Sequence, residues 1–103
     1  MKKTYIELPS VTEFFEQQPE DVQVKYEKII DLLEEKGFLI SPYGEKVEKD
    51  LFAIRITNPK NIRVFYVYMK NDEAYGIHAY EKKSQKIPDR ELNLARKILK
   101  LMR

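Results

Sequence analysis

The 103-residue sequence contains no cysteine and only one histidine. Without cysteine the chain has neither disulfides nor a thiolate nucleophile, and a single histidine argues against a protein-bound zinc ion. No apolar run approaches the roughly 20 residues that span a bilayer. The first residues, MKKTYIEL, lack the apolar core of a signal peptide. We therefore expect a soluble cytoplasmic protein with no membrane association.

Internal repeats, low-complexity segments and linkers are also absent from the sequence. Hydrophobic residues make up 43% of the chain and charged residues 35%, which is typical of a globular protein rather than a disordered one. A chain of this length can bury one modest core but not two. The composition thus predicts that residues 1–103 form a single domain.

Positive and negative charges are unevenly divided between the two halves of the chain. Residues 1–50 carry a net charge of −5, and residues 51–103 carry a net charge of +7. Because polyanions respond to the local field rather than to the total charge, the second half is the part expected to attract nucleic acid. The alternative is a solvated surface whose signs are segregated without a function.

Three apolar-rich runs occupy the middle of the chain: LFAIRIT at 51–57, IRVFYVYM at 62–69 and EAYGIHAY at 73–80. They are rich in β-branched and aromatic residues and are bounded by turn-forming residues, which predicts strands joined by tight turns. A further short strand is predicted within 3–8. The segment 38–50 is expected to be a connector, because it carries turn signals and no clear periodicity.

Helices are predicted on both sides of these strands. The first begins at Pro9 and Ser10, where Ser10 and Glu13 have the spacing of a capping box. The second runs from Pro19 to Gly37 with an apolar stripe at helical spacing, and a third covers roughly 88–101. We expect the first two to form a helical hairpin that covers one face of the sheet.

Strand alternation separates polar residues from the predicted core. Ile54 lies on the core side of its strand, which places Arg55 on the opposite face. In the last strand, simple alternation places His78 on the same side as Gly76. If Arg63 and His78 also point away from the helical hairpin, the three polar side chains share one concave surface. The register that decides this is not determined by the sequence.

Three motifs carry a resemblance to a known family: LFAIRI at 51–56, IRVFYVY at 62–68, and IHAYEKKSQKIPDREL at 77–92 running into ARKILK. In this order, behind an acidic helical hairpin, they resemble the RelE/HigB-type toxins of bacterial type II toxin–antitoxin systems, in particular the phage-derived branch of the ParE/RelE superfamily. The resemblance implies an α+β fold. It consists of a small twisted antiparallel sheet packed by an N-terminal helical hairpin, with a C-terminal helix.

The resemblance also implies a function: an endoribonuclease that enters the ribosomal A site, cuts mRNA and inhibits translation. The implied partners are the ribosome, mRNA and a cognate antitoxin, often a helix-turn-helix protein encoded nearby. RNA carries its own nucleophile, since the 2′-OH can attack the adjacent phosphorus. We therefore expect an mRNA interferase that needs no metal, no cofactor and no covalent intermediate on the protein.

Four residues are expected to be catalytic. Arg55 and Arg63 match the paired strand arginines of the family, and a guanidinium can hold a phosphate with two parallel hydrogen bonds. His78 matches a histidine late in the last strand and is the one side chain that titrates near neutral pH, so it is the expected general base or acid. Lys83 is expected to supply the other proton, with Lys82 or Tyr80 as alternatives.

Further residues are expected to contact the RNA backbone or bases. Lysines in the connector and after the last strand can bind phosphate, and aromatic rings can stack on bases. The expected RNA-binding set is Lys46, Lys49, Phe65, Tyr80, Lys82, Lys86 and Arg90. Glu45 departs from the family pattern, because a second connector lysine is common at this position.

Other functions fit the same residues. The same fold includes ParE-like toxins that inhibit gyrase and cut no RNA, and a non-catalytic, phage-derived nucleic-acid-binding protein is a further alternative. At the level of single residues, His78 can be a hydrogen-bonded structural histidine. Arg55 and Arg63 can be paired with carboxylates of the helical hairpin, such as Glu27 or Glu34.

Overall fold

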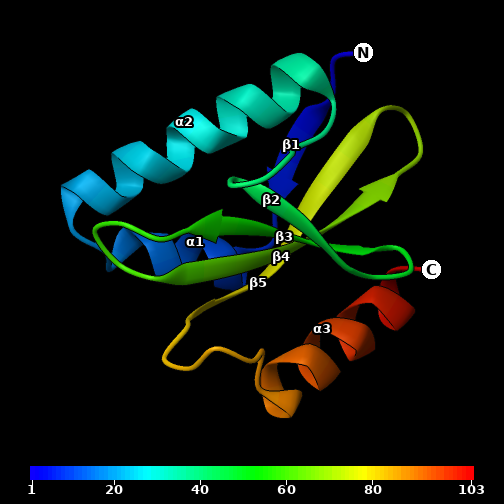
Figure 1. The fold of residues 1–103 in the computed structure, drawn as a ribbon. Coiled ribbons are helices and arrows are strands. Elements are labelled where there is room, and N and C mark those ends of the chain that lie inside the picture. Colours follow the sequence, from blue (N-terminus) through cyan, green and yellow to red (C-terminus); the bar gives the residue numbers. More distant parts are fainter.

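The computed structural model describes residues 1–103 and contains one five-stranded sheet with helices on both faces (Figure 1). The strands are β1 (Thr4–Glu7), β2 (Gly44–Glu48), β3 (Leu51–Ile56), β4 (Ile62–Met69) and β5 (Glu73–Glu81). The helices are α1 (Pro9–Glu16), α2 (Glu20–Lys36) and α3 (Asp89–Met102). No helix is long and apolar enough to cross a membrane.

The sheet has the strand order β1-β5-β4-β3-β2. The pairs β2–β3, β3–β4 and β4–β5 are antiparallel, as expected for strands joined by short turns, but β1 runs parallel to β5. The prediction of a purely antiparallel sheet is therefore wrong, and the sheet is mixed. Alternation within a strand shows which face a residue occupies, but it does not specify the direction of the neighbouring strand.

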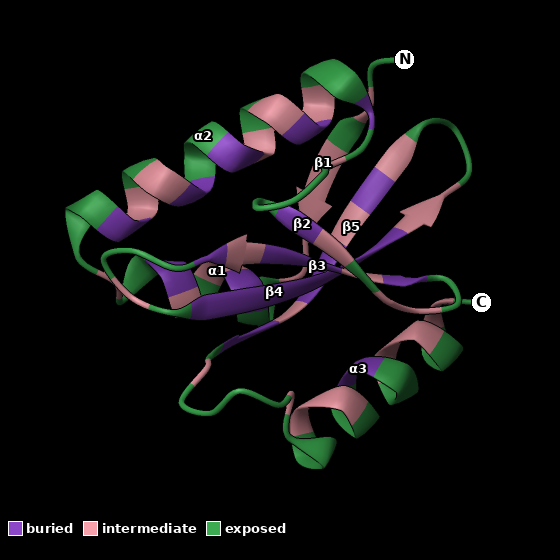
Figure 2. Cartoon of the chain, viewed as in Figure 1, coloured by how far each residue is buried: buried purple, intermediate pink, exposed green.

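Each face of the sheet has its own apolar core. Helices α1 and α2 cover one face, where the aromatic rings of Phe15 and Tyr26 stack with centroids 3.7 Å apart. Helix α3 covers part of the other face, where Ala95 is its only fully buried residue and packs in a cluster with Phe65. Figure 2 shows that buried residues are concentrated in the central strands. The α3 face is thus the more lightly covered of the two.

The helix ends follow the sequence signals in part. Gly37 ends α2 in the left-handed conformation, with φ 82°, as predicted. A Cβ at this position would also collide with the carbonyl oxygen of Met1. At α1 the predicted capping box is wrong: Leu8 is the N-cap residue, no side chain caps the helix, and Ser10 lies inside its first turn.

The segment predicted as a connector contains a strand. Within 38–50, β2 pairs with β3 at the edge of the sheet, where Glu45 lies opposite Ala53. Its sequence, GEKVE, is mostly polar and has a single apolar side chain, Val47, so it shows none of the alternation of a half-buried strand. Only tertiary pairing with β3 makes this segment extended.

A β-bulge in β5 changes the face on which His78 lies. The register pairs Phe65 with His78 but Tyr66 with Gly76, so Ile77 is an extra residue on β5. His78 therefore lies on the α3 face with Phe65, whereas Gly76 lies on the α1–α2 face. The prediction that His78 and Gly76 share a face is wrong because simple alternation fails at a bulge.

Candidate functional site

Two arginines face each other in the hairpin of β3 and β4. The strand register pairs Arg55 directly with Arg63, on the sheet face that carries α3. Like charges directly opposite each other in an antiparallel pair are destabilising. The arrangement therefore favours an anion, either a carboxylate of the protein or a bound ligand, close to the two guanidinium groups.

Arg63 is nearly enclosed, with 3% of its side chain exposed. Its Nη1 donates hydrogen bonds to Oδ1 of Asn61 at 2.9 Å and to the carbonyl oxygen of Ile62 at 3.1 Å. Its Nε lies 3.5 Å from Oε1 of Glu45, in an ion pair that lacks hydrogen-bond geometry. Burial, followed by the charge of Arg55, lowers the pKa of Arg63. The guanidinium nevertheless stays protonated at neutral pH.

A polar hollow of about 440 Å³ opens beside the arginine pair. One wall is the turn between β3 and β4, and the other is the segment 82–85 that follows β5 (Figure 1). The backbone N–H of Lys82 donates to the carbonyl oxygen of Asn61 at 2.7 Å and holds the two walls together. The residues that line the hollow are Arg55, Thr57, Asn61, Arg63, Lys82, Lys83, Ser84 and Gln85. No apolar residue lines it and half of these residues are cationic, which suits a phosphate group.

Lys82 is the lining residue best suited to exchange a proton. It is half-buried, and burial, followed by the charge of Arg63, lowers its pKa. A lysine in this setting releases its proton more readily than a solvated lysine does. Lys83, which also lines the hollow, is exposed and serves as a plain positive charge.

Four buried polar atoms next to the hollow make no hydrogen bond. They are Oε1 of Glu45, Nε of Arg55, Nε of Arg63 and the hydroxyl oxygen of Tyr80. Tyr80 lies opposite Arg63 in the register of β4 and β5. Burial raises the pKa of Tyr80 to about 12, so its hydroxyl is protonated at neutral pH. Nε of Arg63 and Oε1 of Glu45 face each other in the ion pair, and the four atoms together make this a strongly polar region and a candidate ligand site.

His78 shares a sheet face with the arginines but does not line the hollow. Its Nε2 lies 2.7 Å from Oε1 of Glu91 in the first turn of α3, and 15% of its side chain is exposed. Its ring stacks on Phe65 with centroids 6.2 Å apart. The three predicted side chains therefore do not meet in one hollow, because α3 and its carboxylate cover the histidine.

Several predicted RNA-binding residues lie away from the hollow. Lys46 is opposite Phe52 in the register of β2 and β3, so it lies on the α1–α2 face. Lys49 lies in the turn before β3, at the end of that strand remote from Arg55. Lys86 and Arg90 are exposed, and neither lines the hollow.

The two predicted stacking platforms are buried. Phe65 is 0% exposed and Tyr80 is 7% exposed, and their rings stack on each other with centroids 5.8 Å apart. The expectation that they present exposed rings to RNA bases is therefore wrong. Both belong to the apolar cluster beneath α3, because the bulge in β5 turns Tyr80 toward that face.

Sequence reasoning missed four lining residues: Thr57, Asn61, Ser84 and Gln85. The hairpin offered a signal for two of them. A turn that pairs Arg55 with Arg63 also carries Thr57 and Asn61 to the same end of the two strands. Ser84 and Gln85 lie in an irregular segment, where no periodicity shows which way they face.

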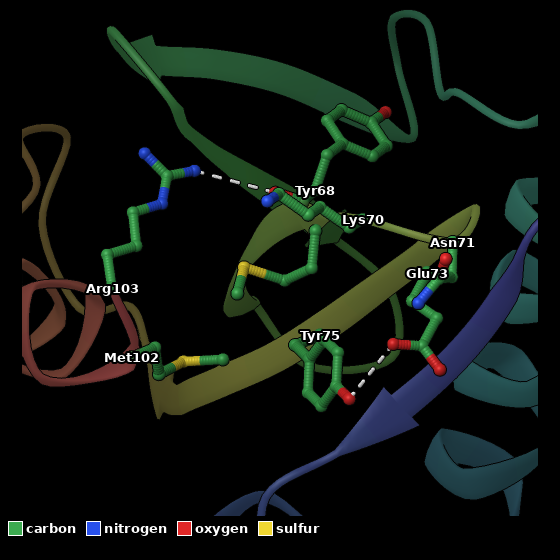
Figure 3. Close-up of a pocket in the computed structure, with 8 residues that line it drawn as sticks. Tyr68, Lys70, Asn71, Glu73, Tyr75, Met102 and Arg103 are labelled. Atoms are coloured by element: carbon green, nitrogen blue, oxygen red, sulfur yellow. Dashed lines mark hydrogen bonds between the residues drawn. The ribbon is translucent and has the colours of Figure 1, made fainter.

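A second hollow, of about 650 Å³, lies between the β4–β5 turn and the end of α3 (Figure 3). It is lined by Tyr68, Met69, Lys70, Asn71, Glu73, Tyr75, Met102 and Arg103. Its main polar groups are already paired: the Tyr75 hydroxyl donates to Glu73, and Arg103 donates to Asp50 and to the carbonyl oxygen of Tyr68. It is larger than the arginine hollow, but it offers a ligand fewer polar groups without a hydrogen-bond partner.

Comparison with known proteins identifies the family of the chain. Residues 13–100 match the sequence profile of the family described as phage-derived protein Gp49-like (DUF891). The match includes every residue that lines the arginine hollow. No curated protein matches the chain.

Proposed function

Because the chain belongs to the phage-derived Gp49-like family, we propose that it is the toxin of a type II toxin–antitoxin module that inhibits translation by cutting mRNA on the ribosome. The observation that carries this proposal is the hollow in which Arg55 and Arg63 lie side by side with Lys82 and Lys83. Four cations and no apolar lining fit the backbone of a single RNA strand better than an apolar metabolite.

The proposed reaction uses the ribose 2′-OH as the nucleophile. Its oxygen attacks the adjacent phosphorus while its proton passes to solvent water, the bond to the 5′-oxygen of the next nucleotide breaks, and a cyclic phosphate and a free 5′-OH result. Arg55 and Arg63 stabilise the negative charge that develops on the phosphoryl oxygens. No metal is required by this scheme, because the substrate supplies the nucleophile and the arginines supply the positive charge.

Proton donation to the leaving group in this scheme falls to a residue of the hollow. We assign the proton given to the leaving 5′-oxygen to Lys82, because burial lowers its pKa. Lys83 holds the RNA backbone by its charge. His78 is assigned a positioning role, since its Nε2 is taken up by Glu91 and does not reach the hollow.

We also propose that the helices are arranged as in RelE-like toxins and that the protein has the partners of such toxins. In it, α1 and α2 correspond to the N-terminal helical hairpin of RelE/HigB-type toxins, and α3 corresponds to their C-terminal helix. The partners are the ribosome, mRNA and a cognate antitoxin, a helix-turn-helix protein encoded nearby. These assignments rest on the resemblance of residues 51–92 and on family membership.

Induced expression in bacteria tests the proposed function. The protein should halt translation and leave cuts within translated messages, with a free 5′-OH at each downstream end. Arg55→Ala should reduce cutting about 100-fold or more, because losing one preorganised donor costs about 3 kcal/mol. The variant should stay folded, since Nε of Arg55 has no hydrogen-bond partner to lose.

The matched control is Lys97→Ala, which removes an exposed charge of α3 outside the hollow and should cut like the wild type. DNA damage without mRNA cuts would instead identify a gyrase-inhibiting toxin. Normal growth combined with RNA binding would identify a non-catalytic binding protein. Either result would overturn the proposal.

A further inference from the structure

The unpaired atoms beside the hollow differ in hydrogen-bonding type. Nε of Arg55 and Nε of Arg63 can only donate, and the carboxylate oxygen Oε1 of Glu45 can only accept. The hydroxyl of Tyr80 can do either. Buried polar groups without a partner are destabilising, so this set favours a ligand that supplies the missing hydrogen bonds.

A phosphate alone does not fit this set. Its oxygens accept hydrogen bonds from the two arginines, but they have nothing to donate to Glu45, and their charge repels the carboxylate. The complete set needs a ligand with an anionic acceptor and a neighbouring hydroxyl donor. In RNA the 2′-OH lies beside the 3′-phosphate, and it is the group by which proteins distinguish RNA from DNA.

The position of Glu45 agrees with this role. It lies on β2 opposite Ala53, on the same sheet face as the arginines, and its Oε1 is 3.5 Å from Nε of Arg63. Glu45 does not line the hollow itself, but its carboxylate reaches a guanidinium that does. It therefore stands next to the place where the phosphate would be held.

Glu45 is not explained as a simple partner for Arg63. A satisfied pair in the same protein is Arg96 with Glu48, in which two hydrogen bonds of 2.7 and 3.0 Å join the side chains. The contact between Glu45 and Arg63 is longer and has no hydrogen bond. Oε1 is buried against Arg63, but the side chain of Glu45 is 37% exposed, so its other carboxylate oxygen can accept a hydrogen bond from a ligand.

We propose that Glu45 selects RNA over DNA by accepting a hydrogen bond from the ribose 2′-OH next to the phosphate held by Arg55 and Arg63. The inference rests on the proposed function and adds to it the residue that recognises the sugar. A 2′-deoxy strand leaves Glu45 unsatisfied and close to the phosphate charge, so the same hollow disfavours DNA.

Two mononucleotides test the inference without cleavage. Adenosine 3′-monophosphate has the 2′-OH beside the phosphate but no following nucleotide to release, and 2′-deoxyadenosine 3′-monophosphate lacks only that hydroxyl. Titration followed by NMR should show tighter binding of the ribonucleotide by about tenfold, the usual effect of a hydrogen bond to a charged group. Glu45→Ala should bring this ratio close to one and should strengthen binding of the deoxynucleotide.

Glu45→Gln provides a second, isosteric variant that keeps an acceptor but loses the charge. It should bind both nucleotides more tightly than the wild type, with a smaller ratio between them. The control is Glu27→Ala on α2, an exposed carboxylate on the other face of the sheet, which should leave the ratio unchanged.

The wild type could bind the two nucleotides equally, with binding lost in Arg55→Ala. That result would overturn the role of Glu45 and leave phosphate binding in place. An unchanged ratio in both Glu45 variants would have the same meaning. If the wild type binds neither nucleotide, the inference and the assignment of the hollow to RNA both fall.

Discussion

His78 joins β5 to α3 through Glu91, and we expect its main effect to be on stability. In His78→Ala the carboxylate of Glu91, which is 20% exposed, loses its partner. The free energy of unfolding in urea should fall by about 1–3 kcal/mol, and the loss should be much smaller in a Glu91→Gln background. Cleavage should fall less than in Arg55→Ala. Lost cleavage at unchanged stability would instead place His78 on the RNA.

We expect the phosphate affinity of the hollow to depend on pH because of Lys82. Its protonated form favours an anion, and burial with the nearby Arg63 lowers its pKa, so the charge is lost at lower pH than in a solvated lysine. Phosphate affinity should therefore decline as the pH rises through that lowered pKa. Lys82→Arg should shift the decline to higher pH, because a guanidinium keeps its proton. Phosphate titrations of the wild type and Lys82→Arg, repeated from neutral to alkaline pH, measure this shift. Identical pH profiles for the two proteins would exclude Lys82 as the source of the pH dependence.

At the scale of the elements, α3 packs on the sheet mainly through partly buried apolar residues, namely Leu92, Ile98, Leu99 and Met102. Ala95 is its one fully buried residue, and Arg96 is paired with Glu48 at the end of β2. The hydrogen bonds from Arg96 lower the pKa of Glu48. The helix therefore depends on exposed ionic contacts as well as on apolar packing.

The pair between Arg96 and Glu48 makes a small, pH-dependent contribution to stability. Its stabilisation is present above the ordinary carboxylate pKa and is lost as the pH falls through the lowered pKa of Glu48 in the folded state. Arg96→Ala should lower the free energy of unfolding only slightly at neutral pH, since the pair is exposed and screened. The difference from the wild type should disappear in acid. Lys97→Ala is the control, and a difference that persists in acid would contradict this account.

Sequence patterns predicted the elements that bury apolar side chains. The β3–β5 strands and α2 were recognised because they combine periodicity with clear end signals, such as Gly37. β2 was missed because an edge strand with one apolar residue has no periodicity to read. The prediction that His78 and Gly76 share a face failed because the bulge at Ile77 depends on pairing with β4, which is not a local property of β5.

The same limit applies to the candidate site. Arg55 and Arg63 could be predicted as a pair, since two arginines at matched distances from a turn must face each other. The role of Glu45 depends on the pairing of β2 with β3, and the segment 82–85 is placed by a backbone hydrogen bond from Lys82 to Asn61. Neither contact has a signature in the sequence.

At the scale of the whole molecule, the charge asymmetry of the chain becomes an asymmetry of the two sheet faces. The segment 9–36, which forms α1 and α2, has eight acidic residues and three lysines, whereas the arginine hollow lies on the opposite face. If the proposed function holds, an RNA strand should be attracted to one side of the protein and repelled from the other, and its binding should depend strongly on salt.

RNA affinity should fall with salt in proportion to the phosphates held by the hollow. Four cations contacting a single strand predict a slope of about −3 for the logarithm of affinity against the logarithm of salt concentration, at about −0.7 per phosphate. Lys83→Ala should make the slope shallower by about 0.7. Lys28→Ala, on the acidic face, should leave it unchanged. A slope near zero would show that charge does not drive binding.

The polar strand β2 also affects how the molecules behave toward one another. As the last strand of the sheet it has backbone groups without a partner strand, and such an edge can recruit another chain and start aggregation. β2 is only five residues long, carries charges at Glu45, Lys46 and Glu48, and is interrupted by a register shift between Lys46 and Glu48. These features oppose the extension of the sheet by a second copy at this edge.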